Sequence, residues 1–202
     1  MSRPLRVMLY DRSCRGRGLA LGGLSHAWSF GGLLYRALGR IDAWHGAWSW
    51  SDGLDWFVEI SRTRPIAEIQ FWGHGEWGGL WIDEELLTAA ALEPDHYLHA
   101  RLAAVKARLA NDALWWFRSC DVFGTQIGHD FARAWTRYFN CRAAGHTHTI
   151  MFVQSGLHML APNEEPTWSL DEGVVDGLAH ASESSLRAPR TITALHNAIP
   201  PR

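Results

Sequence analysis

The 202 residues are enough for one domain with a large core, or for one domain with a tail. A formal net charge of −2 at pH 7 argues against nucleic acid or an anionic membrane surface as a partner. The three cysteines (Cys14, Cys120 and Cys141) show no CxxC spacing, so a disulfide framework and a zinc knuckle are not expected. Without a signal-peptide pattern or an apolar run of membrane-spanning length, we expect a cytoplasmic protein with no membrane partner.

Strands and helices alternate along most of the chain. Apolar runs predict strands, and apolar residues at helical spacing predict helices. The expected strands are Leu5–Tyr10, Ile41–Trp44, Ile66–Trp72, Leu114–Phe117 and the stretch 141–153. The expected helices are 25–39, Asp52–Ser61 with Asp52 as its cap, a turn or two at Leu86–Leu92, 99–112 and Thr125–Phe139. The glycines of 75–83 predict a hairpin arm.

This alternation predicts an α/β fold, with a mostly parallel sheet covered by helices on both faces. Residues 1–160 form the expected α/β domain. Residues 161–202 are rich in proline and show little periodicity. We expect them to form a loop-rich tail packed on the same domain.

Two chemically reactive side chains follow predicted strands. His74 comes after the strand Ile66–Trp72, and Cys120 comes after the apolar run that begins at Leu114. In an open α/β sheet, ligands bind beyond the carboxyl ends of the strands. If the two strands are neighbours, an imidazole and a thiol meet there, and the imidazole can take the thiol proton. The N–H groups of Gly75 and Cys120 would then be the oxyanion donors.

The pattern resembles the caspase-like cysteine peptidases, the group of caspase, legumain, gingipain and separase. A strand ending in His-Gly is followed by a strand ending in a small residue and cysteine, 46 residues apart. A bacterial domain of unknown function from adhesin-like proteins is more similar still. Its motifs correspond here to "HGEWGGLWI", "LWWFRSCDVFGTQIGHDFARAW" and "CRAAGHTHT". The caspase sequence Gln-Ala-Cys-x-Gly is absent, and Arg118-Ser119 replaces the aromatic residue and glycine usual in the bacterial domain.

The resemblance implies a three-layer caspase-like sandwich and an endopeptidase without a cofactor, acting on a peptide or protein. Cys120 would be its nucleophile and His74 its general base and acid. By the same resemblance, Arg118 would line a pocket for an acidic substrate residue. Asp121 and Glu76 flank the pair and are further candidates for substrate binding or for orienting His74. Oligomeric state is not predicted.

Three other functions remain open at this point. A recognition module of the same fold would bind a peptide or glycan in the cleft without catalysing a reaction. His146 and His148 are two residues apart, so they lie on the same face of a strand. Together with His74 they would suit a catalytic zinc ion, although no HExxH motif accompanies them. The glycines after the first strand (Gly16, Gly18 and Gly22) fit a dinucleotide loop incompletely, because the third comes one residue late.

Overall fold

The computed structural model describes residues 3–14, 23–175, 181–196 and 198–199. The strands of the main sheet are β1 (Leu5–Asp11), β2 (Ala43–Ala47), β3 (Ile66–Trp72), β7 (Leu109–Arg118), β8 (Arg142–His146) and β10 (Leu157–Leu160). The helices are α1 (Leu24–Ala37), α2 (Trp50–Ile60), α3 (His99–Lys106) and α4 (Thr125–Phe139), with a 3₁₀ turn η1 at Ala89–Leu92. Smaller sheets contain β4 (His74–Glu76), β5 (Gly79–Ile82) and β6 (Glu85–Thr88), and β9 (Val153–Gln154) with β11 (Ile192–Thr193).

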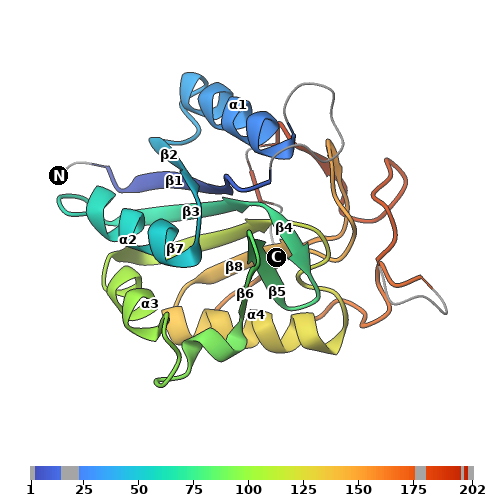
Figure 1. Cartoon of the computed structure of the whole chain (residues 1–202). Helices are drawn as coiled ribbons and strands as arrows, with labels where there is room; N and C mark the ends of the chain where they lie inside the picture. The colour runs from blue at the N-terminus through green and yellow to red at the C-terminus, as the bar shows by residue number, and fades with distance from the viewer. Residues whose placement is uncertain (1–2, 15–22, 176–180, 197, 200–202) are drawn as a thin grey trace.

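The main sheet has the order β10-β8-β7-β3-β1-β2. Every neighbouring pair is parallel except β10 with β8. Helix α1 covers one face, and α2, α3 and α4 cover the other (Figure 1). The prediction of an α/β fold with a mostly parallel sheet between helices is therefore confirmed. Within the described part of the chain, no helix is long and apolar enough to cross a membrane.

Strand side chains alternate between two cores. Val7 and Leu9 of β1 belong to the larger core beneath α2, α3 and α4, and both are fully buried. Met8 and Tyr10 point the other way and pack with Tyr35 of α1. A strand that is apolar on both faces is the expected signature of a covered parallel sheet.

Several local predictions were wrong in detail, among them the start of α2 and the stretch Leu86–Leu92. The cap of α2 is Ser49, whose side chain accepts a hydrogen bond from the Asp52 N–H, and Asp52 lies in the first turn. The stretch Leu86–Leu92 is not one helix, because β6 occupies its first part and η1 its second. Leu87 is buried whereas Leu86 is 37% exposed, which is the alternation of a strand.

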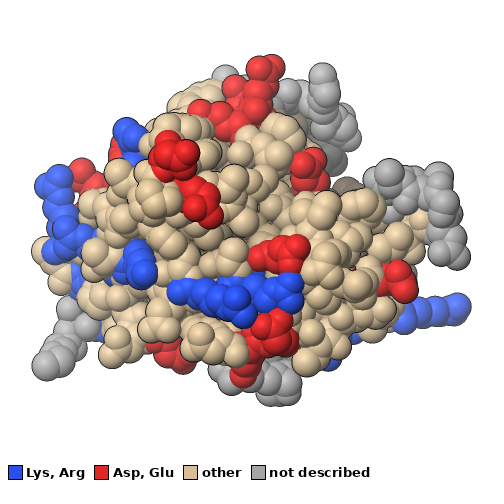
Figure 2. Space-filling view, turned by 90° about the horizontal axis from the view of Figure 1, so that it is seen from below, with Lys and Arg blue, Asp and Glu red and all other residues tan. Residues whose placement is uncertain are grey.

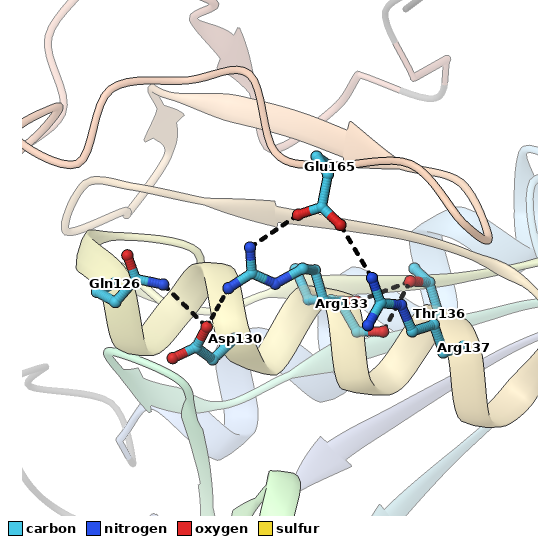
Figure 3. A network of polar contacts seen from close by, with 7 residues as sticks. Gln126, Asp130, Arg133, Thr136, Arg137 and Glu165 are labelled. Carbon is cyan, nitrogen blue, oxygen red and sulfur yellow. Dashed lines mark hydrogen bonds and ion pairs between the residues drawn. The ribbon is translucent and has the colours of Figure 1, made fainter.

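The tail is tied to the domain by a strand and by ion pairs. Its strand β11 pairs with β9, while β10, just before the tail, extends the main sheet at its edge. On the lower face, basic and acidic side chains meet on a largely uncharged surface (Figure 2). There Glu165 of the tail lies between Arg133 and Arg137 of α4 and bonds both, and Arg133 also bonds Asp130 (Figure 3).

Candidate functional site

The two predicted site strands are direct neighbours. β3 and β7 pair in parallel, with Trp72 opposite Arg118. His74 and Cys120 each lie two residues beyond this last pair, so they reach the same edge of the sheet. The sequence-based condition for a shared site, that the two strands be adjacent, is met.

Gly75 allows the two strand ends to approach closely. A Cβ on Gly75 would lie 2.6 Å from the Cys120 carbonyl oxygen and 2.8 Å from Ser119 Cβ. It would also lie 3.4 Å from the Cys120 nitrogen. Any side chain at this position would push the cysteine loop away. Glycine at position 75 is thus required by backbone packing against Ser119-Cys120.

The imidazole of His74 contacts a different thiol from the expected one. Its Nε2 lies 3.3 Å from Sγ of Cys14, three residues after β1. The Trp28 ring of α1 meets the imidazole edge-on, with 5.8 Å between ring centroids. Among the described residues, no hydrogen bond joins His74 to Cys120. The His74–Cys120 hydrogen bond expected of a closed dyad is therefore not formed in this state.

The Cys120 thiol is held by the loop that follows β8. Its sulfur accepts a hydrogen bond from the Ile150 N–H at 3.4 Å. Burial raises the pKa of Cys120, the Ile150 N–H lowers it, and the Asp121 carboxylate raises it further. A thiol in this environment needs a proton acceptor to become a nucleophile at neutral pH.

Asp121 lies in a strained position beside the thiol. Its φ is +41°, its N–H donates to the His148 carbonyl, and its carbonyl accepts from the Gly124 N–H. Burial and the charge of Glu76 raise the pKa of Asp121 to about 6. One carboxylate oxygen is buried, and no partner for it is found among the described residues. Asp121 and Glu76 therefore do lie close enough to interact, as their flanking positions suggested.

We expect Asp121→Asn to stabilise the chain at neutral pH. Folding disfavours the ionised form of an acid whose pKa it raises. Such an acid does not destabilise the fold below its unfolded pKa of about 4, and it lowers the free energy of unfolding as the pH rises through 6. Asparagine removes this loss and tolerates positive φ. The free energy of urea unfolding should rise by on the order of 1–2 kcal/mol at pH 7.5, and not at pH 4.

The matched control is Asp83→Asn, because Asp83 also has a positive φ, 55°, but is exposed. A gain of the same size in this control, or one independent of pH, would assign the effect to the backbone instead of the charge.

Arg118 is buried, with 3% of its surface exposed. Its guanidinium donates to Gln154 Oε1 at 2.7 and 3.1 Å, to the Tyr35 hydroxyl at 2.5 Å and to the Ala194 carbonyl at 3.0 Å. It also lies 4.4 Å from the ring centroid of Trp116. An acidic substrate side chain would have to displace Gln154 or the tail to reach it. Binding of substrate by Arg118 stays a prediction, and its observed contacts are structural.

The histidines proposed as zinc ligands are engaged elsewhere. His146 is fully buried, and its Nδ1 lies 3.0 Å from the Ser155 carbonyl. Burial lowers the pKa of His146 to about 3. His148 is also buried, and its Nδ1 contacts the Thr147 hydroxyl at 2.9 Å. Nowhere in the described ranges do three His, Cys, Asp or Glu side chains converge to hold a metal ion, so the zinc hypothesis finds no support.

The backbone of the same segment supports the cysteine loop. The Asp121 N–H donates to the His148 carbonyl, and the Phe123 N–H donates to the His146 carbonyl, both at 3.0 Å. The segment after β8 thus positions the thiol through main-chain contacts. Sequence reasoning missed this role, because it depends on no particular side chain.

A cavity of about 340 Å³ lies away from the candidate site, between β10 and the tail. Its lining includes Met159, Trp168 and Arg190, and neither His74 nor Cys120 borders it. We therefore place the candidate site at the sheet edge, where His74 and Cys120 follow β3 and β7. Most of the glycine-rich segment considered for a dinucleotide, 15–22, lies outside the described residues. No protein-family model and no curated protein matches the chain.

Proposed function

We propose that the chain is a cysteine-dependent hydrolase of the caspase-like kind, an endopeptidase with Cys120 as nucleophile and His74 as general base and acid. One observation carries the proposal. The parallel pairing of β3 with β7 puts His74-Gly75 directly against Ser119-Cys120. A thiol, an imidazole and two adjacent backbone N–H groups are the parts that acyl transfer requires.

In the proposed reaction, the exposed ring of His74 turns from Cys14 to Cys120 when substrate binds. The imidazole takes the thiol proton, and the thiolate attacks the substrate carbonyl carbon. The N–H groups of Gly75 and Cys120 stabilise the resulting oxyanion. The imidazolium then gives its proton to the leaving amine. Water hydrolyses the thioester on Cys120, with His74 again acting as base.

Cleavage of a peptide library by the purified chain, read by mass spectrometry, tests this proposal. Samples quenched rapidly with acid should also contain an acyl group on the peptide that carries Cys120. Cleavage accompanied by this thioester supports the hydrolase. Absence of both products across pH 5 to 9 would contradict it.

A recognition module is the second candidate, and two observations favour it. The imidazole contacts Cys14 instead of Cys120, and the pKa of Cys120 is raised. This function predicts that peptides or glycans bind near Gly75 without turnover. Binding to an array, with full recovery of the intact ligand and no acyl group on Cys120, would favour the module over the enzyme.

A further inference from the structure

Cys14 brings a second thiol to the imidazole of the candidate site. The sheet order β7-β3-β1 makes β3 the middle strand, so His74 is flanked by the segments that follow its two neighbours. Cys120 follows β7, and Cys14 follows β1. In the observed state, His74 Nε2 lies 3.3 Å from the Cys14 sulfur. The strand ends on both sides of β3 therefore each lead to a thiol, and the imidazole contacts that of Cys14.

The position of Cys14 is fixed by the fold. The Asp11 carboxylate accepts hydrogen bonds from the Ser13 N–H at 2.8 Å and from the Ser13 hydroxyl at 2.6 Å. The Cys14 carbonyl accepts from the Ser25 hydroxyl of α1 at 2.7 Å. The thiol is partly exposed and is not in a disulfide. Its contact with His74 is therefore supported by both β1 and α1.

The three thiols differ in their surroundings. Cys141 is buried in the core, which raises its pKa to about 12. Burial and the neighbouring Asp121 carboxylate also raise the pKa of Cys120. Cys14 has an imidazole at hydrogen-bonding distance, which can accept its proton. Because the thiolate is the reacting species, Cys14 is the thiol best prepared for exchange in the resting state.

We propose that Cys14 is a modification site for thiol–disulfide exchange with a small disulfide such as glutathione disulfide. His74 takes the Cys14 proton, and the sulfur attacks one sulfur of the disulfide. The disulfide bond breaks, one half stays bound to Cys14, and the other leaves as a thiolate that recovers the proton from the imidazolium. The adduct occupies the space beside His74 and keeps the ring from Cys120. This last consequence rests on the proposed function, whereas the exchange itself does not.

The experiment uses the full chain, reduced and then freed of reductant. Glutathione disulfide is added between pH 6 and 8, and adducts are located by peptide mass mapping. We expect a single adduct on Cys14, formed about tenfold or more faster than on Cys120 or Cys141. His74→Asn should slow it by about tenfold and shift its pH profile towards that of an ordinary thiol. Circular dichroism checks that this exposed substitution leaves the fold intact.

Earlier modification of Cys120 or Cys141, or an equal rate on Cys14 in wild type and His74→Asn, would overturn the proposal. The effect of the Cys14 adduct on hydrolysis is measured separately, with any peptide that the chain cleaves. Glutathione disulfide should inhibit wild type reversibly, and should leave the rate of Cys14→Ser unchanged relative to its own untreated sample. An adduct without hydrolysis would reject the proposed function alone. Hydrolysis without a Cys14 adduct would reject this inference alone.

Discussion

Cys120→Ala is expected to lower the rate of peptide hydrolysis by about 10³-fold or more, whichever peptide is cleaved. The substitution removes the atom that forms the thioester in the proposed reaction and leaves the rest of the fold in place. Cys120 is partly exposed, and its sulfur makes hydrogen-bonding contact only with the backbone of Ile150 among the described residues. Alanine there should not disturb the core. Initial rates measured on equal amounts of folded protein give the comparison.

The matched control is Cys141→Ala, which removes a thiol that lies in the core and away from the sheet edge. Its specific activity should stay close to that of wild type, although its stability should fall because a small cavity remains. Activity that survives in Cys120→Ala, or that is lost equally in both variants, would show that Cys120 is not the nucleophile.

His74 provides a further check, because a base and its nucleophile act as a unit. His74→Ala should lower the rate by a similar factor, and the double variant should be no slower than Cys120→Ala. If the two substitutions lowered the rate independently, so that their factors multiplied in the double variant, His74 would not act together with Cys120 in the reaction. His74 is exposed, so its loss should leave the unfolding free energy almost unchanged.

Much of the fold could be predicted because its strands are apolar on both faces. Ile66–Trp72 was predicted with its observed ends, and Thr125–Phe139 was predicted as α4 with its observed ends. β10 was missed because it is short, lies at the edge and follows Gly156, where the periodicity fades. α3 ends at Lys106 and β7 begins at Leu109, although helical spacing continues to 112. Pairing with β3 overrides that local preference.

The candidate site was predictable only in part. His74 and Cys120 could be identified because each follows the end of a predicted strand. That the two residues lie at neighbouring strand ends depends on the order of strands in the sheet, and a pattern of apolar runs does not determine that order. The contact between His74 and Cys14 could not be predicted, because it depends on β1 lying on the other side of β3. The useful signal was the position of Cys14 just beyond a predicted strand, the same feature that singled out Cys120. The burial of Arg118 could not be predicted either, because nothing in the neighbouring sequence indicates that the tail covers it.

Arg118 joins the sheet to the tail through contacts with residues that are far from it in the sequence. Its donors reach Gln154 of β9 and the Ala194 carbonyl beyond β11, and its Nη1 donates to the Tyr35 hydroxyl of α1. Burial lowers its pKa, while Tyr35 and Glu68 act in the opposite direction. A buried cation is retained only where its hydrogen bonds are satisfied. The guanidinium is thus the group on which three separate segments converge.

Arg118→Leu should lower the free energy of unfolding by about 3 kcal/mol or more. Leucine fills part of the volume but leaves the Gln154 amide, the Tyr35 hydroxyl and the Ala194 carbonyl without this donor. Of these three groups only Gln154 Oε1 loses every donor that the described residues supply, because the Tyr35 hydroxyl still donates to the Ala194 carbonyl. Each lost hydrogen bond to a charged group nevertheless costs about 1.5–3 kcal/mol. Urea unfolding measures the loss. Trypsin should also cut faster after Arg187 and Arg190, because the tail is released locally before the domain unfolds.

Arg101→Leu is the matched control, because Arg101 is 41% exposed and pairs with Asp55 on the surface. Its loss should change the unfolding free energy by less than about 1 kcal/mol and should leave the tail protected from trypsin. Arg118→Lys separates charge from geometry. Lysine keeps the cation but has no planar fork, so it cannot bond Gln154, Tyr35 and the tail together. If Arg118→Lys were as stable as wild type, the charge alone would suffice and the shared hydrogen bonding inferred for the guanidinium would be wrong.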